Sequence, residues 1–214
     1  EARRISGETL PFDSRPGSEN RLGYYYRVPI GAIVAITPFN DPLNLVAHKI
    51  GPAIAGGNSV VLKPATETPL SALKLAGALI EAGLPWNILN VVTGRAAEIA
   101  EALITDQRAR MISFTGGTQA GFEIAAKAGL KKLSMELGSN SPVIVMDDCD
   151  LESAVENAIS GAFGAAGQNC IGVQRIYIHD NVYDEYEKRF VARTRKMKAG
   201  CQLYETSDIG PMIS

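Results

Sequence analysis

The sequence predicts an α/β fold built around a doubly wound parallel sheet, and two observations predict it. Short, continuously apolar segments rich in β-branched residues recur along the chain, and a segment of helical periodicity follows most of them. Strands that are apolar throughout are typical of a parallel sheet covered by helices on both faces. At 214 residues the chain is also long enough to bury a large core.

The first half of the chain shows this alternation clearly. Residues 1–20 are polar and rich in Gly, Ser and Pro, so we expect extended or irregular chain, and the aromatic segment 21–29 suits a strand or the end of a hairpin. Strands are then predicted at 31–38, 58–64, 87–94 and 110–116, and helices at 42–56, 69–82, 95–105 and 118–128. Such a sheet binds ligands at the carboxyl ends of its strands.

The second half continues the pattern after a short break. Strands are predicted at 131–138, 141–148 and 173–180, with helices near 151–166 and 181–199. The stretch 138–142, "GSNSP", has the composition of a linker. We therefore expect a second α/β unit to begin there.

Composition excludes several classes of protein. The chain is 46% hydrophobic and 21% charged with a net charge of −2, so a nucleic-acid or membrane-surface partner is not expected. It has no apolar run of 18 residues and no apolar core of a signal peptide near its first residue. Its three cysteines include no CxxC pair, which favours free thiols in a reducing compartment over disulfides or zinc. His48 and His179 have no ligand companion at useful spacing, so no metal site is predicted.

Three strand ends carry polar groups suited to a ligand. Gly116 and Gly117 lie between a strand and a helix, where backbone N–H groups can face an anion, although a simple tight turn is an equal alternative. Lys63 ends a strand and can bind ribose hydroxyls or phosphate; alone, it would more readily be a solvated lysine. Asn40 lies in a turn stiffened by flanking prolines, where its amide can donate to an oxyanion or simply cap the turn.

Two further residues suggest covalent chemistry. Glu136 interrupts an apolar strand, where a buried carboxylate with a raised pKa would be a candidate general base; the alternative is an edge strand with Glu136 facing water. Cys170, in "GQNC", is by itself most simply a small buried hydrophobe. Cys149 and Cys201 lie in acidic or surface settings that do not favour a thiolate.

Taken in order, "TPFN", "GGNSVVLKPA", "FTGGTQAG", "MELG" and "GQNC" resemble the aldehyde dehydrogenase superfamily. The resemblance implies that Cys170 is the nucleophile, that the Asn40 amide and the Cys170 N–H hold the oxyanion, and that Glu136 activates water. A thiohemiacetal would pass hydride to the nicotinamide, and the resulting thioester would be hydrolysed to a carboxylic acid. Glu136 and the cofactor's positive charge would help to form the thiolate.

The resemblance also implies a dinucleotide site. Its residues would be Ile36, Thr37, Pro38, Lys63, Thr66, Gly94, Phe114, Gly116, Gly117 and Leu137. Gly117 stands where a serine is common, so one hydroxyl contact to phosphate would be lost. Thr66 stands where relatives that prefer NAD often carry a glutamate, so we expect NADP to be used at least as well as NAD. Glu67, next to Thr66, argues against this expectation, because its carboxylate could repel the 2′-phosphate of NADP.

By resemblance, residues 1–29 would form a polar lead and an oligomerisation-hairpin strand, residues 30–136 a Rossmann-like dinucleotide-binding domain, and residues 137–214 the first part of a catalytic domain. The chain would be the centre of a cytoplasmic enzyme that acts on a small aldehyde as a homodimer or homotetramer. The motif "TPFNDPLNLVAHK" resembles the branch of lactaldehyde, phosphonoacetaldehyde and non-phosphorylating glyceraldehyde-3-phosphate dehydrogenases.

Three questions remain open at this point. Arg175 is the one arginine near the nucleophile in sequence and could bind an anionic substrate, but a structural role is the better interpretation. One alternative function is a CoA-acylating aldehyde dehydrogenase, although such enzymes typically lack the glutamate at position 136. The other is an inactive, truncated or structural relative.

Overall fold

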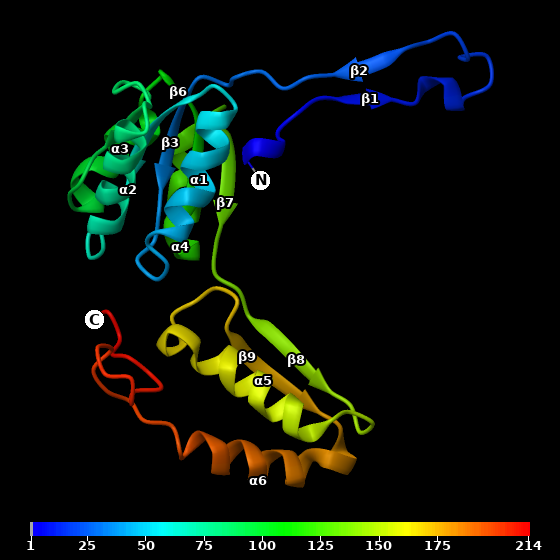
Figure 1. Ribbon diagram of the computed structural model, residues 1–214, viewed down its shortest axis with the longest axis vertical. Coiled ribbons are helices and arrows are strands. Elements are labelled where there is room, and N and C mark those ends of the chain that lie inside the picture. The colour runs from blue at the N-terminus through cyan, green and yellow to red at the C-terminus, as the bar shows by residue number, and fades with distance from the viewer. Residues whose placement is uncertain (1) are drawn as a thin grey trace. The chain divides into compact units, whose positions relative to one another are not determined.

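The computed structural model describes residues 2–214, which form two compact units (Figure 1). The first unit ends at Leu137, and the second comprises Gly138–Ser214. Each unit has its own hydrophobic core, so each is described by itself.

The first unit contains a five-stranded, fully parallel sheet in the order β5-β4-β3-β6-β7. Its strands are β3 (Ala32–Ile36), β4 (Ser59–Lys63), β5 (Leu89–Val91), β6 (Ala109–Thr115) and β7 (Lys132–Glu136). The chain runs outward from β3 to β5 and then returns to β6 beside β3. This reversal of strand order confirms the predicted doubly wound sheet, and such sheets bind ligands at the carboxyl ends of the two strands where the order reverses, here β3 and β6.

Alternation along the central strand divides the core between the two faces of the sheet. Ile33 and Ala35 of β3 pack with α1 (Asn44–Ala55) and α2 (Leu70–Glu81). Val34 and Ile36 pack on the opposite face with α3 (Ala96–Thr105) and α4 (Thr118–Ala128). The four helices lie within a few residues of their predicted positions.

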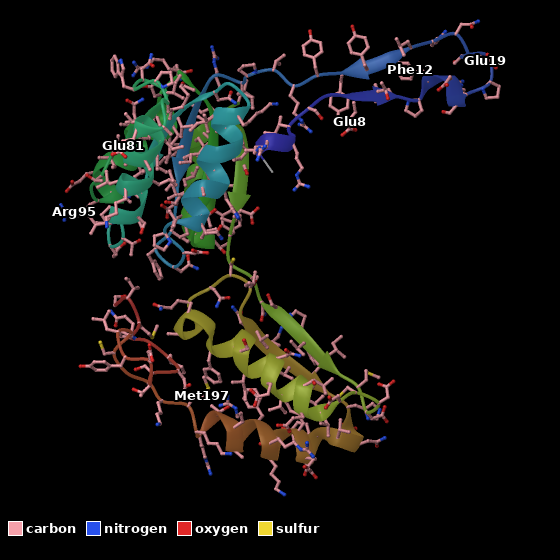
Figure 2. All side chains as sticks on the ribbon, in the orientation of Figure 1. Glu8, Phe12, Glu19, Glu81, Arg95 and Met197 are labelled. Atoms are coloured by element: carbon pink, nitrogen blue, oxygen red, sulfur yellow. The ribbon has the colours of Figure 1, made fainter. Side chains whose placement is uncertain are left out.

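A short antiparallel hairpin precedes the sheet (Figure 1). It pairs β1 (Glu8–Leu10) with β2 (Gly23–Tyr25), and Phe12, labelled in Figure 2, lies between the two strands in sequence. An added Cβ on Gly23 would lie only 2.6 Å from the Phe12 ring, so the glycine makes room for it. The hairpin and the segment after it expose large apolar side chains, namely Phe12, Leu22, Tyr24, Tyr26 and Val28.

The second unit packs two helices against a two-stranded parallel sheet. Strands β8 (Ser141–Val145) and β9 (Val173–Ile178) pair with each other, and α5 (Leu151–Phe163) and α6 (Tyr183–Thr194) contribute to the core. The fully buried Tyr186 of α6 stacks on Phe190 at 6.0 Å between ring centroids. Asp150 caps α5 by accepting hydrogen bonds from the backbone N–H groups of Glu152 and Ser153.

The predicted ends of two helices are wrong, and one of these is the helix expected near 181–199, which is α6 and ends at Thr194. The helix expected to reach residue 166 ends at Phe163, because Ala165 and Ala166 adopt left-handed backbone conformations with φ of 53° and 56°. Because β8 begins at Ser141, the predicted linker is also shorter than 138–142. None of the helices in residues 2–214 has the length and apolarity that crossing a membrane requires.

Candidate active site

The predicted ligand residues of the first unit lie at one edge of its sheet. Parallel pairing sets Ile36 opposite both Lys63 and Phe114, and it sets Thr115 opposite Glu136. The pairing continues beyond the strand ends, since the Thr37 N–H donates to the Lys63 carbonyl at 3.2 Å. Residues from four strands are therefore gathered at the carboxyl edge, where a ligand crevice is expected.

Lys63 is not a solvated surface lysine. It is 3% exposed, and its Nζ donates to the Pro64 carbonyl at 2.9 Å. Burial lowers the pKa of Lys63 below its ordinary value, while the charge of Glu67 acts against this shift. A buried ammonium group held at a strand end is suited to hydrogen bonding with a ligand.

Thr37 is a second buried polar residue at this edge. It is 4% exposed, and its Oγ1 atom has no hydrogen-bond partner within residues 2–214. A buried hydroxyl without a partner is uncommon and costs free energy. The observation therefore fits a position that a polar ligand completes.

The glycine turn after β6 is open on one side and tightly packed on the other. A Cβ on Gly116 would lie 2.5 Å from the Phe114 ring, whereas a Cβ on Gly117 would meet no atom within 4 Å. Gly117 is the N-cap of α4 and provides no side-chain cap. The first-turn N–H groups can therefore face a phosphate. Phe114 itself is 6% exposed and belongs to the core, as a support for this turn.

The remaining predicted cofactor residues divide between this edge and the packing behind it. The Thr66 hydroxyl donates to the Gly94 carbonyl at 3.1 Å, which joins the chain after β4 to the chain after β5. Leu137 packs against α4, where a Cβ on Gly121 would lie 2.5 Å from its Cδ2. Ile36 is buried beside this packing.

Asn40 follows β3 in the segment that leads into α1. It is partly buried, and its Oδ1 atom has no hydrogen-bond partner within residues 2–214. Pro38 and Pro42 restrict the backbone on both sides of it. The side-chain carbonyl oxygen of Asn40 is thus an acceptor without a partner among the described residues, in the segment that follows β3.

Glu136 matches the edge-strand alternative and not the carboxylate buried in an apolar strand. β7 is an edge strand of the described sheet, and Glu136 is exposed at its carboxyl end. The backbone carbonyl of Glu136 accepts from the Gly116 N–H at 3.0 Å, which fixes the main chain beside the glycine turn. The carboxylate is therefore positioned by the strand while its side chain stays accessible.

Lys49 is a candidate functional residue that was not among the residues predicted from the sequence. Its Nζ donates to Ser113 Oγ at 3.1 Å, and burial lowers its pKa to about 8 while the charge of Glu136 acts against this shift. The signal was present in the sequence, because Lys49 is in phase with the buried Val46 and Ala53 of α1. A lysine on the apolar face of a predicted helix requires a partner or a function.

Lys49 should make stability rise with pH. Its pKa is about 8 in the folded chain, below an ordinary value of 10.5, so the folded state bears the cost of the buried charge below pH 8. That cost disappears between the two pKa values, because the folded state releases its proton first. Lys49→Met should therefore have a higher free energy of unfolding than the wild type at pH 7. This difference between variant and wild type should shrink by about 2 kcal/mol between pH 7 and pH 10.

Urea unfolding at pH 7, 8.5 and 10 measures this difference. Lys74→Met, which removes an exposed lysine of α2, controls for the loss of one positive charge. If Lys49→Met and the wild type show parallel pH dependence, the buried-charge interpretation is wrong.

Cys170 lies in the second unit, in a loop between α5 and β9 that contains residues 164–172, here called the nucleophile loop. The thiol is exposed, which contradicts the reading of Cys170 as a buried core residue. Ala165 and Ala166, just before it, lie in the left-handed region that costs about 1–2 kcal/mol per residue for side chains larger than glycine. Such strain persists only where neighbouring contacts hold the backbone.

Side-chain hydrogen bonds hold this loop. Asn169 Nδ2 donates to the Gly164 carbonyl at 2.8 Å, and Gln168 Oε1 accepts from the Ile213 N–H at 2.9 Å. Ser139 Oγ donates to the carbonyl oxygen of Cys170 itself. Three side-chain hydrogen bonds therefore restrain Cys170 and the two residues before it.

Arg175 has a structural role in the second unit. Its guanidinium donates to the Asn140 carbonyl at 2.8 Å and to the Tyr177 hydroxyl at 3.2 Å, and it lies 5.7 Å from the Tyr177 ring centroid. These contacts support the structural interpretation over an anion-binding role.

The other reactive residue types have simple surroundings. His179 caps a short 3₁₀ helix by accepting from the Asn181 N–H, and His48 is exposed on α1. Cys149 and Cys201 are free thiols. Residues 2–214 contain no cluster of three or more His, Cys, Asp or Glu side chains that could hold a metal ion.

A doubly wound sheet with polar residues at its carboxyl edge is typical of dinucleotide-binding proteins, and the second unit presents an exposed thiol. Comparison with known proteins agrees: the chain belongs to the aldehyde dehydrogenase family, whose model matches residues 1–214. Over its whole length the chain is 56% identical to aspartate-semialdehyde dehydrogenase 1 of Pseudomonas canavaninivorans and 53% identical to 3-sulfolactaldehyde dehydrogenase of Priestia megaterium. It covers 45% of each of these relatives.

Solved structures agree with this assignment. A glyceraldehyde-3-phosphate dehydrogenase of Methanocaldococcus jannaschii, solved with NADP, matches the whole chain with a TM-score of 0.90 and 39% identity, and the chain covers 46% of it. Succinate- and glutarate-semialdehyde dehydrogenases are further relatives, and a betaine aldehyde dehydrogenase of Staphylococcus aureus was solved with NAD+. The chain thus spans less than half the length of these relatives.

Proposed function

We propose that this chain carries the chemical centre of an NAD(P)-dependent aldehyde dehydrogenase that converts an aldehyde to a carboxylic acid. The observation that carries the proposal is the shared sheet edge, where Asn40, Lys63 and Glu136 follow three different strands beside the reversal of strand order. Cys170, the proposed nucleophile, belongs to the other unit.

Each proposed role follows from the chemistry of the residue. The Cys170 thiolate adds to the aldehyde carbon, and the Asn40 amide with the Cys170 N–H stabilises the oxyanion. After loss of hydride the acyl group remains on sulfur as a thioester. Glu136 then takes a proton from water, which attacks the thioester and releases the carboxylic acid and the thiol.

The residues at the sheet edge fit a dinucleotide. The unpartnered Thr37 hydroxyl, the buried Lys63 ammonium and the open side of Gly117 provide a donor, a cation and space for phosphate at one edge. Lys63 and Thr66 would hold the adenine ribose, and Gly116 and Gly117 would face the pyrophosphate. When bound, the dinucleotide supplies the hydride acceptor for the oxidation.

We further propose that the substrate is a small aldehyde that carries an acidic group. Support comes from the relatives at 53–56% identity, whose names specify aspartate semialdehyde and 3-sulfolactaldehyde. The sequence resembles dehydrogenases of lactaldehyde, phosphonoacetaldehyde and glyceraldehyde-3-phosphate, and the last two of these substrates carry an acidic group. Because Arg175 is engaged by Asn140 and Tyr177, we assign it a structural role and not the binding of the substrate anion.

Two alternatives make different products. A CoA-acylating enzyme would pass the acyl group from the cysteine sulfur to CoA, yet Glu136 is present and accessible for hydrolysis. An inactive relative would produce no acid at all.

We also propose that the hairpin of β1 and β2, with the segment after it (here called the apolar hairpin), mediates assembly into a homodimer or homotetramer, because its large apolar side chains are exposed.

Initial rates with NAD and NADP test the function, the substrate class and the cofactor together. We expect acid formation without CoA, higher kcat/KM for aspartate semialdehyde and 3-sulfolactaldehyde than for uncharged aldehydes of equal length, and rates with NADP at least equal to those with NAD. The variant Thr66→Glu should lower kcat/KM for NADP relative to NAD by about tenfold or more, because its carboxylate repels a 2′-phosphate. Strict dependence on CoA, or a strong NAD preference of the wild type, would contradict the corresponding proposal.

A further inference from the structure

We propose that Ser139 is a positioning residue for the nucleophile and acts through its hydrogen bond to the Cys170 carbonyl. This inference rests on the proposed function, in which the Cys170 thiolate attacks and the Cys170 N–H stabilises the oxyanion. Ser139 itself contacts neither the substrate nor the reacting atoms. Its role is to set the orientation of the backbone that carries both groups.

The nucleophile loop needs such a contact because its backbone is strained. Ala165, Ala166 and Gly167 adopt left-handed conformations in succession, with φ of 53°, 56° and 74°. Two of these residues carry a Cβ, so the loop does not adopt this path by local preference. The bonds from Asn169 and Gln168 hold the chain before the thiol, and the bond from Ser139 acts on Cys170 itself.

Ser139 is itself anchored by the second unit. Its Oγ lies 2.9 Å from Ser141 Oγ, and Ser141 is the first residue of β8, paired with Val173 of β9. Because Ser139 donates to Cys170, its oxygen is free to accept from Ser141. The adjacent Asn140 carbonyl accepts from Arg175, which is also a residue of β9. The serine is therefore anchored to the paired strands β8 and β9. The nucleophile loop leads from α5 into β9, so it is attached to the same strand pair.

The position of this hydrogen bond determines which kinetic constant it affects. The Cys170 carbonyl and the next N–H belong to one peptide plane, so holding the carbonyl restricts rotation about the Cys170 Cα. The Cα carries both Sγ and the Cys170 N–H, so this restraint fixes how both groups are oriented relative to β8 and β9, and both act only as the carbon–sulfur bond forms. Loss of the contact should therefore reduce kcat and leave KM nearly unchanged.

Kinetics of Ser139 variants in the complete dehydrogenase test the inference. We expect Ser139→Ala to lower kcat about tenfold, with KM within twofold of the wild type, and Ser139→Thr to restore at least half of the activity. Ser207→Ala is a matched control, because Ser207 Oγ makes the same kind of bond, to the Cys201 carbonyl at 2.9 Å. It should lose a similar amount of stability and keep the wild-type kcat.

Threonine and valine at position 139 provide a second comparison of equal size, with and without the hydroxyl. Equal kcat for Ser139→Thr and Ser139→Val would overturn the inference, as would equal loss of kcat in Ser139→Ala and Ser207→Ala. Failure of the proposed function is distinguished by Cys170→Ala: if that variant remains active, the nucleophile assignment fails whatever Ser139 does. If it is inactive while Ser139→Ala is normal, only the positioning role is wrong.

Discussion

Replacing Cys170 by alanine is expected to reduce aldehyde oxidation by about 10⁴-fold or more, the scale of loss seen when an enzymatic nucleophile is removed. The reason is that no other group can form the thiohemiacetal from which hydride leaves. The variant should fold normally, because the thiol is exposed and lies outside the core. Absorbance of NAD(P)H measures the rate.

Two controls make this result specific. Cys201→Ala removes the other exposed thiol and should keep full activity. Dinucleotide affinity, measured by calorimetry, should be unchanged in Cys170→Ala, because the proposed cofactor residues belong to the other unit. Substantial turnover by Cys170→Ala would refute the covalent mechanism.

Replacing Glu136 by glutamine should separate the two halves of the reaction. The amide has the same shape but cannot accept a proton from water, so we expect steady-state turnover to fall by about 10²–10⁴-fold. Oxidation itself can occur once per site, and a burst of no more than one equivalent of NAD(P)H should precede the slow phase. Mass spectrometry should find the acyl group on Cys170 at the end of the burst.

Stopped-flow absorbance resolves this burst, and an exposed carboxylate of α4 provides the control. Glu123→Gln should behave as the wild type, since Glu123 is exposed on α4 and accepts a hydrogen bond from the neighbouring Gln119. A slow, linear time course without a burst would place Glu136 before hydride loss. Unchanged turnover would remove it from the mechanism.

The strand and helix pattern was predictable because it depends on local apolar periodicity. α4 lies at the predicted 118–128, and α2 lies within one residue of its prediction at each end. The doubly wound parallel sheet was predicted from the alternation of strands and helices and is confirmed, whereas its strand order was not predicted. The left-handed alanines were not predictable, since alanine favours helix locally and no glycine or asparagine marks positions 165 and 166.

Some residues of the candidate site could likewise be identified from the sequence, and others could not. Residues at strand ends, such as Lys63 and Asn40, could be identified because a parallel sheet collects its carboxyl ends at one edge. The exposure of Glu136 was one of two alternatives that the sequence left open, because it depends on whether another strand pairs with β7. Ser139 was missed because its contact to Cys170 joins residues 31 apart in sequence. Such long-range contacts leave no periodic signal.

The apolar hairpin has a practical consequence for the isolated chain. Its two strands of three residues leave backbone hydrogen-bonding groups unpaired along their outer edges, next to Tyr24, Tyr26 and Val28. An uncovered edge of this kind recruits further strands and promotes aggregation during expression and concentration. Charged substitutions on the outer side of this hairpin are therefore the first choice for keeping the 214-residue chain dispersed, provided that assembly is not the property under study.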